Sequence, residues 1–166
     1  MPRMQIAESG NEEKNTPAPH QQGRLLALDL GTKRVGVAIS DELQITITPV
    51  GSITRKSWKD LLSKITALID SYKPTAIVIG LPVRLDGSEG TAAATTRETA
   101  DKFRRSLSLP VYLQNESLTT VEAESHLKAR GKKINEIANE NDSEAAAIIL
   151  RDFLAAQQTK LTSNPE

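Results

Sequence analysis

Along this chain, segments whose apolar residues follow a strand pattern alternate with segments whose apolar residues recur at the helical period. The stretch Leu25–Asp41 reads as an apolar strand, a tight turn and a second apolar strand. Alternating β-branched residues in Gln44–Val50 predict a third strand, which Pro49 places at an edge or an end of the sheet. Ala76–Gly80 is a short continuous apolar run, which is typical of a central strand covered on both faces. Pro110–Asn115 predicts another short strand.

Apolar residues at the helical period predict four helices, over Ser57–Lys73, Thr91–Leu107, Thr119–Arg130 and Asp142–Gln157. A polar connector is expected between the last two, over 132–140. The order is three strands, then helix, strand, helix, strand, helix and helix. An antiparallel meander followed by alternating helices and strands predicts an α/β protein with a mixed five-stranded sheet and helices on both faces.

Composition divides the chain into three parts. Residues 1–23 are polar and carry Pro17 and Pro19, so we expect a disordered N-terminal tail. Residues 24–157 hold all the periodic segments and form one expected domain. Residues 158–166 are expected to be a frayed C-terminal tail.

Charge and residue usage exclude several classes of function. The 166 residues include 21 basic and 21 acidic ones, so any contact with nucleic acid must come from a local patch. Cysteine is absent, which excludes disulfides and thiolate metal sites. No apolar run reaches the roughly 20 residues of a membrane span, and no signal-peptide pattern opens the chain. A soluble cytoplasmic protein that does not contact the membrane is the expectation.

Three carboxylates occupy unusual places in this layout. Asp29 interrupts the apolar run of the first strand, Glu116 directly follows the last strand, and Asp142 opens the last helix. Strand ends of such a sheet gather functional groups at one edge, so the three acids could meet there. Clustered carboxylates repel one another, and a hard divalent cation such as Mg²⁺ or Mn²⁺ relieves that repulsion. This chemistry is typical of metal-dependent cleavage of a phosphodiester.

Each acid also has a simpler interpretation. Asp142 fits a helix-capping or first-turn acid, and Glu116 fits a solvated loop residue. Asp29 could accept hydrogen bonds from the turn amides of Gly31 and Thr32, although strand interiors disfavour Asp. Gly31 and Gly36 allow a sharp turn and a close approach of the backbone to a ligand.

Four segments of the chain resemble the motifs of the YqgF (RuvX) family. Asp29–Asp41 (DLGTKRVGVAISD) resembles the opening motif, and Val78–Ser88 (VIGLPVRLDGS) resembles the middle one. Glu116–Ala123 (ESLTTVEA) and Asp142–Leu150 (DSEAAAIIL) resemble the last two. The motifs follow one another in the family's order, over about 24–156. This resemblance implies an RNase H-like fold.

The resemblance also implies an activity and its residues. It implies a nuclease that processes the 5′ end of precursor 16S ribosomal RNA, with Holliday-junction resolution of branched DNA as the older assignment. Asp29, Glu116 and Asp142 match the family's acidic triad for Mg²⁺ or Mn²⁺, and Lys33 and Arg34 match its basic turn. Structured RNA and ribosomal precursor particles are the implied partners, for a monomer or a homodimer.

One motif departs from the family's pattern, and three other functions remain open. Asn115-Glu116-Ser117 stands where the family usually has Asp-Glu-Arg, so one charge and one arginine are missing. The departure keeps open a non-catalytic module that associates with RNA or ribosomes. A junction resolvase needs two active sites, and an ATP-binding protein of the actin-like type needs a second lobe that this chain is too short to hold.

Overall fold

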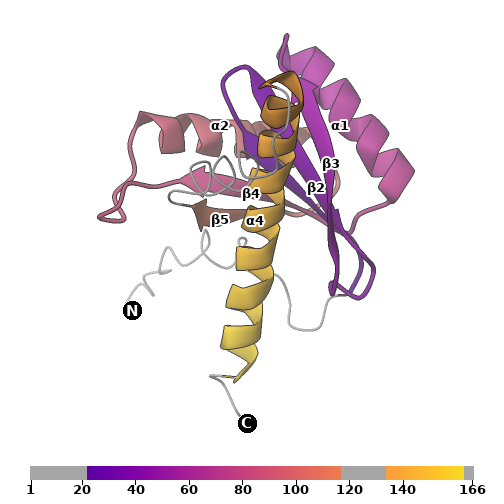
Figure 1. Cartoon of the computed structure of the whole chain (residues 1–166), viewed down its shortest axis with the longest axis vertical. Coiled ribbons are helices and arrows are strands. Elements are labelled where there is room, and N and C mark those ends of the chain that lie inside the picture. The colour runs from indigo at the N-terminus through magenta and orange to yellow at the C-terminus, as the bar shows by residue number, and fades with distance from the viewer. Residues whose placement is uncertain (1–21, 117–133, 163–166) are drawn as a thin grey trace, which may run out of the picture.

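The computed structural model describes residues 22–116 and 134–162. Five strands and three helices lie in these two segments (Figure 1). In chain order they are β1 (Leu25–Leu30), β2 (Arg34–Ser40), β3 (Ile47–Thr54), α1 (Trp58–Tyr72), β4 (Ala76–Pro82), α2 (Thr91–Ser106), β5 (Val111–Glu116) and α4 (Ile134–Thr162). The helix expected over Thr119–Arg130 and the expected tail up to residue 21 lie outside the described residues.

The strands form one mixed sheet in the order β3-β2-β1-β4-β5. The first three strands pair antiparallel, whereas β4 and β5 run parallel to β1. This order confirms the predicted RNase H-like fold. It also confirms the edge position that Pro49 indicated, because β3 borders the sheet. Since β1, β4 and β5 are parallel, their carboxyl ends lie at one edge of the sheet.

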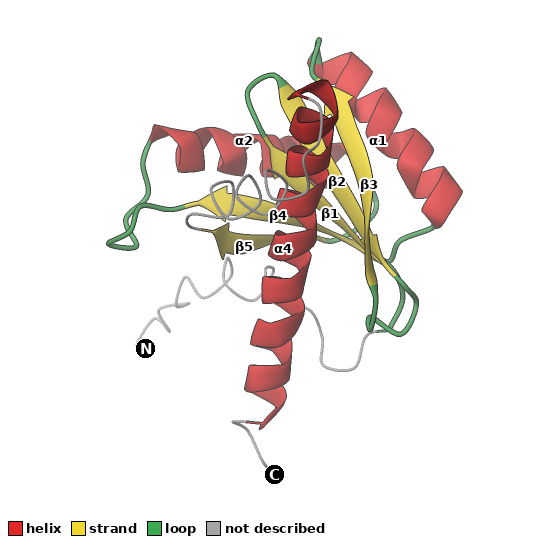
Figure 2. Cartoon of the chain, in the orientation of Figure 1, coloured by secondary structure: helices red, strands yellow, loops and turns green. Residues whose placement is uncertain are grey.

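Helices cover both faces of the sheet, as the sequence predicts (Figure 2). α1 and α2 share one face with the larger side chains of the strands, and Trp58 of α1 lies 4.9 Å from Phe103 of α2 between ring centroids. α4 covers the other face, where the strands present small side chains such as Ala27 and Ala38. Small residues beneath a helix allow the helix axis to approach the sheet closely.

The described structure corrects three boundaries. α4 runs to Thr162, beyond the predicted end at Gln157, so the tail expected to be frayed over 158–166 is helical as far as Thr162. The polar connector expected over 132–140 is wrong from Ile134 onward, where α4 begins. Asn and Glu residues dominate 134–141, but Ile134, Ile137 and Ala138 recur at the helical spacing, a signal that the sequence prediction missed. β3 begins at Ile47 and runs on to Thr54, beyond the predicted end at Val50. Within the described ranges, no helix has both the length and the hydrophobicity needed to cross a membrane.

Candidate active site

Asp29 lies on the face of the sheet that α4 covers. Side chains alternate along a strand, so Asp29 follows Leu25 and Ala27, which pack against α4. Burial and, to a smaller extent, the negative charge of Asp142 together raise the pKa of the Asp29 carboxyl from 3.8 to about 6. Asp29 is therefore a carboxylate whose negative charge the protein itself compensates poorly.

Gly36 brings Asp142 to the side of Asp29. Gly36 is the direct partner of Asp29 across the β1–β2 pair. The main-chain carbonyl of Asp142 occupies the space that a Cβ atom on Gly36 would need. Only glycine leaves room for the helix backbone there, so this contact fixes α4 over the strand pair. The close approach expected at Gly36 is to a helix of this chain.

Arg34 joins the turn between β1 and β2 to α4. Its Nε atom donates a hydrogen bond of 2.6 Å to Oδ2 of Asp142, and both side chains are partly open to solvent. Gly31 closes the turn, because its N–H group donates to the main-chain oxygens of Asp29 and Arg34. The Gly31 amide therefore does not satisfy the Asp29 carboxylate, so the alternative of a turn-satisfying role fails at that residue.

Glu116 reaches the same face of the sheet from the carboxyl end of β5. Its Oε2 atom lies 2.6 Å from the position that a Cβ atom on Gly80 would take. Gly80 belongs to β4, the strand between β1 and β5, and follows Ile79, which pairs with Leu28. The carboxylate of Glu116 thus leans across β4 toward the strand that carries Asp29. Position 116 is partly buried and its main-chain oxygen accepts a bond from Val83, so it is not a freely solvated loop residue.

The structure brings the acids together unequally. The charge of Asp142 acts on the Asp29 carboxyl, whereas Glu116 lies on the same face with β4 between its strand and β1. Across residues 22–116 and 134–162, no three acidic or histidine side chains are close enough to form a ready metal site. The oxygens of these acids still suit a hard divalent cation, and the raised pKa of Asp29 marks a place that favours added positive charge.

Asp142 is not the capping acid that the sequence also allowed. α4 begins at Ile134, so Asp142 lies well inside the helix, and its side chain pairs with Arg34. Lys33 is exposed at the turn, as expected for a residue that could meet a phosphate. Two contributors were missed from the sequence: Gly80, which makes room for Glu116, and Arg55, which binds the turn. Their signal was only their position at the ends of strands.

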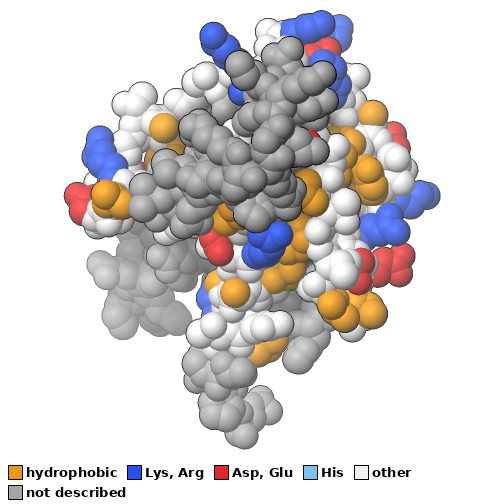
Figure 3. Space-filling model, in the orientation of Figure 1, with side chains coloured by type: hydrophobic (Ala, Val, Ile, Leu, Met, Phe, Trp, Pro, Cys, Tyr) orange, Lys and Arg blue, Asp and Glu red, His pale blue; other side chains and the backbone are white. Residues whose placement is uncertain are grey.

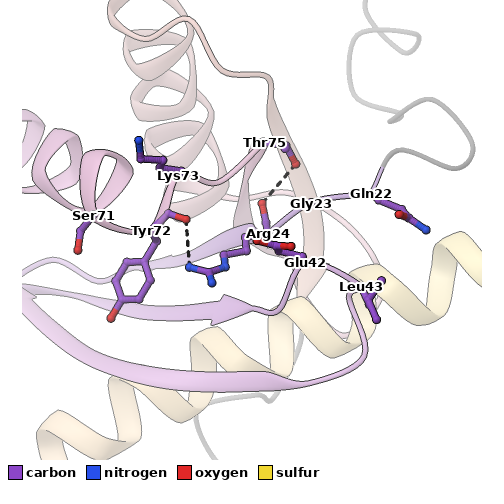
Figure 4. A pocket seen from close by; sticks show the side chains of 9 residues that line it. All are labelled: Gln22, Gly23, Arg24, Glu42, Leu43, Ser71, Tyr72, Lys73 and Thr75. Atoms are coloured by element: carbon purple, nitrogen blue, oxygen red, sulfur yellow. Dashed lines mark hydrogen bonds between the residues drawn. The ribbon is translucent and has the colours of Figure 1, made fainter.

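A cavity of about 580 Å³ lies at the opposite end of β1 (Figure 4). It is lined by the residues that precede β1, that follow β2 and that end α1, and none of the three acids takes part. Arg24 donates to the main-chain oxygen of Tyr72, and Thr75 donates to that of Arg24, which ties the cavity walls together. The cavity is therefore separate from the acidic site.

A known family covers most of the chain. The family model described as "RuvX: Holliday junction resolvase" matches residues 23–156, which is most of the chain. The chain belongs to the RuvX family. The family match spans Asp29, Glu116 and Asp142, and it includes the turn with Lys33 and Arg34.

Two relatives in the family carry the same name. A protein of Anaeromyxobacter sp. (strain K), named "Putative pre-16S rRNA nuclease", is 40% identical over 131 residues, which are 79% of this chain and 96% of the relative. One of the same name from Syntrophus aciditrophicus (strain SB) is 39% identical over 142 residues, or 85% of this chain and 95% of the relative. Among solved structures, T. thermophilus RuvC in complex with Holliday junction substrate aligns with a TM-score of 0.49 and 12% identity, covering 82% of this chain and 97% of that chain. That weak alignment carries no argument about activity.

Proposed function

We propose that this protein is a nuclease that hydrolyses phosphodiester bonds with the help of Mg²⁺ or Mn²⁺. The proposed substrate is the 5′ end of precursor 16S ribosomal RNA, the activity for which its relatives are named. The observation that carries the proposal is the position of the partly buried Asp29 on the α4 face, where the charge of Asp142 helps to raise its pKa. A carboxylate with a raised pKa beside a second acid destabilises a strand, so such an arrangement is typical of a functional site.

The three acids would hold the metal from three separate elements. Asp29 comes from β1 and Asp142 from α4, and Glu116 at the end of β5 has the longest and most flexible side chain of the three. A divalent ion bound there would activate a water molecule and stabilise the leaving oxygen. Lys33 and Arg34 lie on the adjoining turn, where their charges would orient the phosphates on either side of the cleaved bond.

Cleavage of a precursor 16S RNA fragment tests the proposal. With Mn²⁺ or Mg²⁺, the wild-type protein is expected to cut the RNA, and chelation is expected to stop it. Asp142→Asn and Glu116→Gln should each lower the rate by about 100-fold or more, because each removes a charged metal ligand. Asp70→Asn, the same chemical change on the exposed side of α1, should leave the rate unchanged.

Two outcomes would contradict this function. RNA binding without any metal-dependent cleavage would indicate the non-catalytic module that the Asn115–Ser117 departure leaves open. Cleavage of a four-way DNA junction with no cleavage of the RNA would favour the activity in the family's description. Both substrates are therefore assayed side by side at equal protein concentration.

Arg34→Gln should separate metal binding from cleavage. The change removes a cation that competes for Asp142, so the affinity for Mn²⁺ should rise by up to about fivefold, the value of an exposed ion pair. Cleavage should nevertheless become slower, because a phosphate contact is lost. Titration calorimetry with Mn²⁺ measures the first effect. Arg97→Gln, which breaks an exposed pair with Glu89, is the control and should not change the affinity. Weaker Mn²⁺ binding by Arg34→Gln would contradict the prediction.

A further inference from the structure

Lysine and arginine side chains gather at the end of the molecule where the β1–β2 turn meets the start of α1. Figure 3 shows them at the top of the view, above the elements that carry the acids. Lys33 belongs to the turn, Arg55 and Lys56 follow β3, and Lys59 lies in the first turn of α1. We refer to these four residues as the basic edge. Arg34 stands between the basic edge and Asp142.

Hydrogen bonds fasten the two segments of the basic edge into one unit. Arg55 donates from Nη1 to the main-chain oxygen of Gly31 at 2.8 Å, and its N–H group donates to that of Lys33 at 2.8 Å. The register of β2 and β3 pairs Arg34 with Thr54, so Arg55 meets the turn directly. The positions of Lys33 and Arg34 relative to the acids therefore depend on Arg55.

The two segments of the basic edge bring positive charges together without an acid of their own. Neither 30–40 nor 52–59 contains an acidic residue. The nearest acid along α1, Asp60, is paired with Lys64 at 3.0 Å. Lys33, Lys56 and Lys59 are exposed, and none of them forms an ion pair with the described part of the chain. The positive charge of Lys59 is also unfavourable in the first turn of α1, because the N-terminus of a helix repels a cation.

We propose that the basic edge binds the phosphate backbone of the RNA strand that flanks the cleaved bond. This inference rests on the proposed function, since it places the RNA on the edge that adjoins the acids. The edge is an exposed turn and a helix start, which suits an extended polyanion that runs across the surface. Contacts of lysine and arginine with phosphates position a nucleic acid without reading its bases. Arg55 is a positioning residue, because it acts through the turn it holds.

RNA binding measured without cleavage tests the basic edge. Fluorescence anisotropy of a labelled precursor 16S fragment, in EDTA and over a series of KCl concentrations, gives the Kd and its salt dependence. Lys56→Ala and Lys59→Ala should each weaken binding several-fold and reduce the slope of log K against log salt by about 0.7–0.9. Arg105→Ala removes an exposed cation from the last turn of α2 and should change neither quantity.

Arg55 needs a second readout, because it binds the turn as well as adding charge. Arg55→Lys keeps the charge but loses the planar group that bonds to Gly31. We expect it to keep most of the salt slope and to lower kcat, whereas Lys56→Ala should raise KM and leave kcat unchanged. A merely structural role for Arg55 would lower the melting temperature without this split between kcat and KM.

The outcomes separate this inference from the proposed function. Unchanged Kd and salt slope in Lys56→Ala and Lys59→Ala would overturn the basic edge, even if the wild-type protein cleaves RNA. Absence of RNA binding by the wild-type protein would overturn it as well. Weakened binding in these variants would support the basic edge even if no cleavage is found, and only the proposed function would then fail.

Discussion

Asp29→Asn is expected to make the metal-free protein more stable at pH 8 and to abolish cleavage. Burial and the charge of Asp142 raise the pKa of Asp29 to about 6 in the folded protein, above the ordinary value of 3.8. A raised pKa means that the folded state prefers the protonated acid. Its stabilising contribution is complete below about pH 4 and is lost as the pH rises through 6.

The size of the effect follows from the same shift. A change of about two pKa units corresponds to about 2–3 kcal/mol of unfolding free energy at pH 8. Asparagine carries no charge at any of these pH values, so the variant avoids this penalty. The melting temperature of the variant should exceed that of the wild type by about 5–10 °C at pH 8, and the difference should shrink toward zero near pH 4.

Thermal unfolding at several pH values in EDTA measures the effect, with Asp70→Asn as the matched control. Adding Mn²⁺ should then stabilise the wild type, by about 2.7 kcal/mol at 100 times its Kd, and should stabilise Asp29→Asn much less. The prediction would be contradicted if the variant were less stable than the wild type at pH 8, or if the difference in melting temperature did not depend on pH. Asp29 would then not be an acid whose charge is stabilised by a metal ion.

Gly36→Ala should destabilise the protein more than the addition of a methyl group at any other described glycine. The added Cβ atom would overlap the main-chain carbonyl of Asp142, and a helix backbone cannot rotate away as a side chain can. We expect a loss of about 3 kcal/mol or more in unfolding free energy, together with loss of cleavage, because α4 must shift from β2.

Gly87→Ala is the control for this substitution. Gly87 has a φ of 83°, and an added Cβ atom there meets nothing within 4 Å. Its cost is limited to the left-handed backbone, about 1–2 kcal/mol, and cleavage should be retained. Chemical denaturation and the RNA assay, applied to both variants, measure the contrast. Equal stability of the two variants would mean that α4 is not held against Gly36.

Sequence reasoning succeeded where the evidence is local. The apolar run that placed Asp29 in a strand is confirmed, and strand alternation then places Asp29 on the α4 face. The apolar run at β4 correctly predicted a central strand, whereas β5 borders the sheet. It failed at the start of α4, because the Asn and Glu residues of 134–141 obscured the helical spacing of Ile134, Ile137 and Ala138.

The contacts that build the site could not be predicted from periodicity. Arg34 and Asp142 are 108 positions apart, and their pairing depends on how closely α4 approaches the sheet. Gly36 suggested a close approach but not to which partner. Arg55 looked like an ordinary charged residue after a strand, and only the register of β3 against β2 brings it to Gly31.

The direction of α4 has a practical consequence. The helix runs from the acids along the sheet and continues past the sheet's lower end (Figure 1). At 1.5 Å per residue, Thr162 lies roughly 30 Å along the axis from Asp142. If RNA is cleaved at the acids as proposed, a fluorophore or an affinity tag attached at Thr162 would therefore lie well away from the cleaved bond.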